Sequence, residues 1–143
     1  MMTFDTKIKV ILRDDLEPWQ ELNVTAFLIS GIAATQDIVG EPYIDANGVQ
    51  YLPMSQQPIM IHTASADKLK EIMKSATEKG MAVSIYTHEL FITYNDEDNR
   101  AEVAKYKTDD LDLVGIGIRG KKNPLDRITK ELTCIVNESD IST

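Results

Sequence analysis

Short apolar segments alternate along this chain with longer segments whose apolar residues recur at helical spacing. The short segments are rich in β-branched residues, which pack well on a pleated sheet, and we expect strands over residues 7–12, 58–63, 81–87 and 111–118. The longer segments predict helices over residues 18–34, 66–79 and 124–132, and a short helix over 100–104. Pro18 and Pro124 suit the first turns of their helices, and Gly80 suits a helix end. This alternation is typical of an α/β domain.

The length of the chain, 143 residues, suits one domain, because domains most often contain about 100–150 residues. We therefore expect a single α/β domain over residues 1–143, with its core over residues 7–135 and a short C-terminal tail. A β-hairpin is expected as an extra feature, since Asn47-Gly48 separates Tyr43-Ile44 from residues 49–52. Asn-Gly tolerates the positive φ angles of a type I′ turn, which joins paired strands through a two-residue loop.

The chain is acidic, with 15 Lys and Arg against 23 Asp and Glu and a net charge of -8. This balance argues against a nucleic-acid partner, because nucleic-acid binding draws on a positively charged surface. No segment approaches about 18 consecutive apolar residues, so we expect no membrane span and no membrane partner. Residues 1–5 lack the basic start of a signal peptide, and Cys134 is the only cysteine. The expected location is the cytoplasm.

Polar residues lie at the ends of three of the predicted strands: Arg13, Asp14 and Asp15 follow the first, His62 lies at the end of a later one, and the pair His88-Glu89 follows another. If these strands are parallel, their carboxyl ends share the edge of the sheet where α/β proteins tend to bind ligands. A zinc site built from both histidines and an acid is conceivable, since neutral imidazole suits zinc. However, no two ligands show a short metal-binding spacing. Histidines hydrogen-bonded to their neighbours are therefore favoured, and we expect no metal and no cofactor.

Residues 115–120 match the pattern G-x-G-x-x-G between a predicted strand and a predicted helix. A dinucleotide fold needs a further strand with an acidic ribose ligand about 20 residues later, and the chain leaves little room for one. Two of these glycines fall inside the strand, where they are expected to permit close packing. No nucleophile elbow G-x-S-x-G occurs, and Cys134 lies in an apolar run, so no activated nucleophile is evident.

Positive charge gathers near the C-terminal end of this otherwise acidic sequence, at Arg119, Lys121, Lys122, Arg127 and Lys130. Such a patch is compatible with a phosphate site where the last helix begins. More often such a patch is a solvated helix face, and here Asp126 and Glu131 dilute the positive charge. The sequence leaves both interpretations open.

Several blocks of the sequence resemble a small bacterial family known only as a domain of unknown function. The resemblance covers residues 7–132 in order, and its blocks are residues 13–20, 22–28, 40–43, 51–54, 89–91 and 112–115. That family is similar in fold to the class II peptidyl-tRNA hydrolases. The resemblance implies a mixed four-stranded sheet with helices packed around it, and by analogy a homodimer. A dimer would also cover the apolar hairpin residues Tyr43, Ile44, Tyr51 and Leu52.

The hydrolase motifs are only partly kept. Arg13, Asp15 and Leu16 reproduce the Arg-x-Asp-Leu that ends the first strand of the hydrolases, and Glu89 with Thr93 keeps an acid and a threonine at the spacing of a later motif. Asn23, however, takes the place of the lysine that the hydrolases need. A lysine stabilises developing negative charge, whereas an asparagine offers only neutral hydrogen bonds. The resemblance thus implies the fold without peptidyl-tRNA hydrolysis.

We expect residues 13–15 to meet residues 88–93 at one sheet edge, with Asn23 facing the same cleft from the first helix. In a small-ligand-binding or regulatory domain, Arg13 would pair an acidic group, and Asn23 and Thr93 would supply hydrogen bonds. In the alternative, a hydrolase of a small ester or amide, Glu89 is the general base, with His88 as the other candidate. The competing interpretation is structural: Arg13 and Asp15 brace the loop through a salt bridge and a helix cap.

Overall fold

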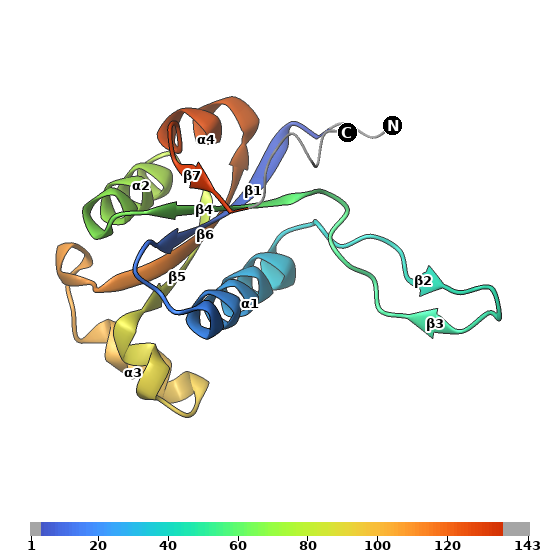
Figure 1. Ribbon diagram of the computed structural model, residues 1–143, viewed down its shortest axis with the longest axis horizontal. Coiled ribbons are helices and arrows are strands. Elements are labelled where there is room, and N and C mark those ends of the chain that lie inside the picture. The colour runs from blue at the N-terminus through green and yellow to red at the C-terminus, as the bar shows by residue number, and fades with distance from the viewer. Residues whose placement is uncertain (1–3, 136–143) are drawn as a thin grey trace.

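The computed structural model of the chain describes residues 4–135 and has a mixed β-sheet with helices on both faces (Figure 1). In chain order its elements, with η for 3-10 helices, are β1 (Thr6–Arg13), α1 (Pro18–Thr35), β2 (Tyr43–Ile44), β3 (Gln50–Tyr51), β4 (Ile59–Ala64), α2 (Ala66–Glu78), β5 (Ala82–Thr87), η1 (His88–Ile92), α3 (Asp96–Ala104), η2 (Thr108–Asp110), β6 (Leu113–Lys121), α4 (Lys122–Ile128) and β7 (Thr133–Cys134). The expected α/β class is confirmed. The C-terminal tail expected after residue 135 lies outside the described residues.

The main sheet has five strands in the order β5-β6-β1-β4-β7 rather than the four that were expected. β1 and β4 are parallel and the other pairs are antiparallel, so the sheet is mixed, as expected. The fifth strand exists because α4 ends at Ile128 and Glu131 adopts a φ of 70°, which turns the chain back. Thr133 and Cys134 then pair with β4. A strand of two residues has no periodicity by which a sequence could reveal it.

The two faces of the sheet carry different helices, with α1 on one face and α2 and α4 on the other (Figure 1). Alternation along β1 produces this division, because successive side chains of a strand point to opposite faces. Val10 and Leu12 pack in the cluster that contains Val24 and Leu28 of α1. Ile11 packs instead in the cluster formed with α2 and α4. Both faces of the sheet are therefore buried.

All three glycines of the G-x-G-x-x-G stretch lie inside β6, and Gly115 and Gly117 let α1 approach the sheet closely. A Cβ atom built on Gly115 would lie 2.6 Å from Cγ1 of Val24, and one built on Gly117 would lie 3.2 Å from Cβ of Leu28, both in α1. The packing role predicted for these glycines is confirmed. A nucleotide-binding turn is not formed, because β6 continues through Gly120 to Lys121.

The expected hairpin is present, and β2 and β3 extend away from the sheet (Figure 1). Its turn differs from the prediction, because residues 45–49 separate the two strands and positive φ occurs at Gly48 but not at Asn47. Asp45 explains the wider loop: its carboxylate accepts hydrogen bonds from the backbone amides of Asn47 at 2.9 Å and Val49 at 3.0 Å. The type I′ turn was therefore a wrong prediction.

The region between β5 and β6 is more helical than expected. Asn95 caps α3 by accepting a hydrogen bond from the backbone amide of Asp98, so this helix begins at Asp96, before the expected residue 100. The 3-10 helices η1 and η2 were not expected. Among residues 4–135, no helix is long and apolar enough to cross a membrane.

Candidate functional site

Three strands of the sheet end at one edge, which we call the strand-end edge. β1 and β5 are both antiparallel to β6, and β4 is parallel to β1, so β1, β4 and β5 all finish where β6 begins. Arg13 ends β1 there, and the backbone amide of His88, directly after β5, donates to the carbonyl of Asp112 at 2.9 Å. The loops after β1 and β5 are thus brought together, with the start of β6 between them.

Arg13 is held by two carboxylates at this edge. Its Nε donates to Oδ1 of Asp15 at 2.7 Å, and its Nη1 donates to Oδ1 of Asp112 at 2.9 Å. Burial alone would lower the pKa of the Arg13 guanidinium, but the two carboxylates raise it above its ordinary value. The hydrogen bond from Arg13 in turn lowers the pKa of Asp15. The salt bridge of the bracing interpretation is therefore present, but the helix cap is not supplied by Asp15, because Glu17 is the N-cap of α1. A ligand acid would have to compete with two aspartates for Arg13.

An aromatic cluster joins α1 to the segment after β5. Trp19 of α1 contacts Phe91 of η1 with ring centroids 5.6 Å apart, Phe91 contacts Tyr86 at 5.1 Å, and Tyr86 contacts Phe27 at 5.9 Å. The exposed ring of His88 lies edge-on to Phe91 at 5.8 Å. We use the name aromatic cluster for Trp19, Phe27, Tyr86 and Phe91. It fixes η1 on the face of the sheet that α1 covers.

Glu89, in η1, is a predicted site residue with a buried oxygen atom that lacks a hydrogen-bond partner within residues 4–135. Its Oε2 atom is shielded from solvent and has no hydrogen-bond partner among the described residues. A buried carboxylate oxygen without a donor is unfavourable, because water no longer solvates it. The last side-chain torsion of glutamate has a broad, two-fold preference, so a half-turn exchanges this oxygen with Oε1. The carboxylate can therefore accept a hydrogen bond or a proton from a ligand at η1.

Thr93 and Asn23, the two residues predicted to supply hydrogen bonds to a ligand, differ in whether they are already bonded within the chain. The Thr93 hydroxyl lies within hydrogen-bond distance of the Leu90 carbonyl, at 3.1 Å, and of the Asn99 side-chain oxygen, so it closes η1 and ties it to α3. Asn23 is half-buried on α1. It lies one helical turn from both Trp19 and Phe27, and therefore on the side of α1 that carries the aromatic cluster.

The two histidines considered for a metal site are far apart in the sheet. His62 lies in β4 and His88 follows β5, with β1 and β6 between these strands. Adjacent strands are about 4.8 Å apart, so no single ion can reach both imidazoles. No group of three or more His, Cys, Asp or Glu side chains in residues 4–135 could hold a metal ion. The strand order therefore contradicts the alternative in which His62 and His88 share a zinc ion.

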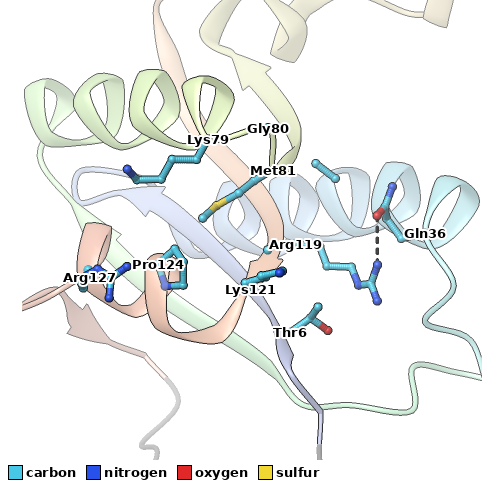
Figure 2. A pocket seen from close by; sticks show the side chains of 11 residues that line it. Thr6, Gln36, Lys79, Gly80, Met81, Arg119, Lys121, Pro124 and Arg127 are labelled. Carbon is cyan, nitrogen blue, oxygen red and sulfur yellow. Dashed lines mark hydrogen bonds between the residues drawn. The ribbon is translucent and has the colours of Figure 1, made fainter.

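The opposite edge of the sheet carries a basic pocket (Figure 2). This cavity of about 490 Å³ is lined by Thr6, Gln36, Lys79, Gly80, Met81, Ala82, Arg119, Gly120, Lys121, Pro124 and Arg127. Of the basic patch seen in the sequence, Arg119, Lys121 and Arg127 line the pocket, whereas Lys122 and Lys130 do not. The sequence interpretation did not include Lys79 in the basic patch. Gly80 was the available signal, because this glycine, with a φ of 73°, forms the turn that brings the chain from α2 to β5 beside β6.

Comparison with known proteins identifies a family and similar solved structures. Residues 6–135 match the model of a family described as "Protein of unknown function (DUF2000)". The chain is also similar to the structure of the protein of unknown function Atu0240 from Agrobacterium tumefaciens strain C58, with 42% sequence identity and a TM-score of 0.88. That similarity covers 94% of this chain and 100% of the other. No curated protein matches.

Proposed function

We propose that this chain, which belongs to the DUF2000 family of proteins of unknown function, is a small-ligand-binding domain that does not hydrolyse peptidyl-tRNA. The proposed ligand lies against η1 at the strand-end edge. Glu89 is its main polar contact, Asn23 supplies hydrogen bonds from α1, and the aromatic cluster supplies apolar surface. Arg13 and Asp15 hold the loop after β1 in place for this contact.

The observation that carries this proposal is the unpartnered Oε2 of Glu89. Three of the other predicted site residues are engaged: Arg13 binds Asp15 as well as Asp112, and Thr93 binds Leu90 and Asn99. Glu89 is left as the group whose hydrogen bond a ligand would complete. Pockets for small molecules commonly combine apolar and aromatic walls with a few such polar groups. The expected ligand therefore carries an N–H or O–H donor beside an apolar part.

The absence of peptidyl-tRNA hydrolysis is supported by the charges at this edge. The guanidinium of Arg13 is bound to Asp15 and Asp112, and Asn23 occupies the position of the hydrolase lysine that the resemblance indicates. A developing oxyanion or a tRNA phosphate would meet aspartates here without a free lysine or arginine. The likeness of the sheet to class II peptidyl-tRNA hydrolases is part of the same proposal and concerns the fold, not the reaction.

A second candidate function uses the same carboxylate as a general base. A hydrolase of a small ester or amide would need a base to take a proton from water, and a poorly solvated glutamate oxygen is suited to that task. Glu89→Gln separates the two functions, because glutamine keeps the size and a hydrogen-bonding side chain but removes the base. Binding that survives in Glu89→Gln with loss of product formation would establish the hydrolase.

A thermal-shift screen tests the binding function, with nucleotides, acyl esters, amino acids and divalent metals as probes. We expect at least one probe to raise the midpoint of unfolding in the native chain, and the shift to disappear in both Asn23→Ala and Glu89→Ala. Glu41→Ala is the matched control, since Glu41 is exposed beside the hairpin. A shift that both site variants retain would contradict a site at η1.

Peptidyl-tRNA itself tests the negative part of the proposal. We expect no release of tRNA above the buffer rate when the purified chain is incubated with N-acetylated aminoacyl-tRNA. Restoration of the missing cation by Asn23→Lys, followed by the same assay, measures whether the lysine alone separates this chain from the hydrolases. Efficient turnover by the native chain that is lost in Glu89→Ala would refute the proposal.

A further inference from the structure

Four cations from three parts of the chain line the basic pocket, although the whole chain has a net charge of -8. Lys79 follows α2, Arg119 and Lys121 end β6, and Arg127 lies in α4. No carboxylate is among the lining residues. Concentrated positive charge without a neighbouring acid costs electrostatic energy through self-repulsion, and an anion in the cavity would relieve it.

The acids that dilute the patch in the sequence do not neutralise the pocket. Asp126 is engaged by Lys7 at 3.0 Å and Lys9 at 3.1 Å. Glu131 lies in the turn before β7 and does not line the cavity. Among residues 4–135, Lys79, Arg119, Lys121 and Arg127 take part in none of the ion pairs that the structure shows. The four charges therefore remain available for a ligand.

Arg119 is the oriented member of the set. Its Nη1 donates to Oε1 of Gln36 at 3.2 Å, which holds the guanidinium against the end of α1, as the dashed line in Figure 2 shows. Its Nε is shielded from solvent and has no partner within the described part of the chain. An oxygen acceptor that enters the cavity could satisfy this donor after a small rotation of the side chain. A planar guanidinium held on one side is well suited to bind phosphate oxygens on the other.

From this geometry we propose that the basic pocket binds the phosphate group of a small phosphorylated molecule. Arg119, Lys121, Arg127 and Lys79 contact the phosphate, and Met81 and Pro124 provide the apolar wall for the rest of the ligand. The volume of about 490 Å³ lies within the usual range of small-molecule sites and suits a compact phosphoester or diphosphate. This site lies at the opposite edge of the sheet from Glu89, so each proposal can fail without the other.

Pyrophosphate is the probe for this inference, with isothermal titration calorimetry on the full chain at low ionic strength. We expect saturable binding of one pyrophosphate per chain, weakened by about tenfold in each of Lys121→Gln and Arg127→Gln, since each removes a charge-assisted contact. The Nε–H resonance of Arg119 in a nitrogen-15 spectrum should shift on titration. That shift reports contact with this side chain directly and does not depend on a variant that could unfold.

Lys122→Gln and Lys130→Gln are the matched controls, because they remove the same charge from the same patch outside the pocket. We expect these two variants to change the affinity by less than about twofold, as is typical of screened surface charges. Equal weakening by all four variants would indicate diffuse attraction and overturn the inference. So would an absence of saturable binding, an unmoved Arg119 resonance, or tighter binding of a single-stranded oligonucleotide that also depends on Lys122.

Discussion

At the scale of single residues, Lys9 is a buried cation in the middle of β1. Its Nζ donates to Oγ1 of Thr129 at 2.8 Å and lies 3.1 Å from Oδ1 of Asp126, which Lys7 also contacts. Burial alone would raise the pKa of Asp126, but the hydrogen bonds from Lys7 and Lys9 lower it below its ordinary value. This ion pair connects the first strand to α4.

Asp126→Asn should lower the free energy of unfolding at pH 7 by about 1–3 kcal/mol, less than for a fully buried pair because Asp126 is partly exposed. Since the folded-state pKa of Asp126 is depressed, its stabilisation is full above about pH 4 and disappears as the pH falls through the lower folded value. Urea unfolding from pH 7 to pH 2.5 should therefore show the gap between native chain and variant closing in acid. A difference in the free energy of unfolding that stays constant with pH would contradict this pH dependence. So would an equally large difference for the control Asp37→Asn, since Asp37 is exposed.

Gly117 tests the closeness of α1 to the sheet. A Cβ at this position would lie 2.6 Å from Oγ of Ser84 in β5 and 3.2 Å from Cβ of Leu28 in α1, so Gly117→Ala must displace the Ser84 hydroxyl and press on the helix. We expect a loss of about 1–3 kcal/mol, the usual cost of overpacking. Gly31→Ala is the control from the same interface, because its Cβ would lie at an ordinary 3.6 Å from Cβ of Ser84. Denaturant unfolding that ranks both variants equally would refute the packing role.

At the scale of secondary-structure elements, the hairpin of β2 and β3 depends on Asp45. The Asp45 carboxylate accepts hydrogen bonds from the Tyr51 hydroxyl at 2.8 Å and from the Asn47 and Val49 amides. The hydrogen bond from Tyr51 is the largest of the interactions that lower the pKa of Asp45. Since residues 41–52 are all exposed, the turn holds the hairpin together without support from the core.

Asp45→Ala should open the hairpin locally and leave the midpoint of thermal unfolding almost unchanged. Amide hydrogen exchange at Val49 should become faster, because its hydrogen bond to the carboxylate is lost. In the native chain the same acceleration should appear as the pH falls through the depressed pKa of Asp45, once the intrinsic pH dependence of exchange is removed. Slow exchange at Val49 in Asp45→Ala would show that the strand pairing alone suffices.

At the scale of the whole molecule, the hairpin is an apolar arm without a partner among residues 4–135. Ile44 is 65% exposed and Leu52 is 85% exposed, and Tyr43, Val49, Tyr51 and Met54 extend the same surface. A two-stranded hairpin by itself is marginally stable in water, and large exposed apolar patches mark interaction sites. A homodimer that covers this arm is the expected assembly.

Sedimentation velocity should show a dimer whose dissociation to monomers depends on concentration. Ile44→Asp and Leu52→Asp should shift it to the monomer, because each would bury a charge in an apolar interface. Tyr94→Asp is the control, since Tyr94 is 97% exposed away from the arm. A native chain that sediments as a monomer at all concentrations would refute the dimer.

Much of the fold was predictable because local patterns specify it. The helix at Pro18–Thr35, the end of α2 before Gly80 and the four longer strands of the main sheet follow from periodicity, proline placement and a left-handed glycine. The packing role of Gly115 and Gly117 was also predictable, since a glycine inside a strand indicates close approach. Short-range chemistry and alternation are properties of the chain itself.

Other features depend on contacts between residues far apart in the sequence. β7 forms because it pairs with β4. The hairpin loop is wider than predicted because Asp45 binds backbone amides. His62 and His88 are far apart because of the order of the strands. Lys79 lines the basic pocket because α2 packs beside the end of β6. Asp126 does not line it, because its carboxylate is bound by Lys9 of β1. A sequence lists which charges exist. Which of them neutralise one another and which remain for a ligand is decided only by the distances in the folded chain, because electrostatic and hydrogen-bond energies fall steeply with separation.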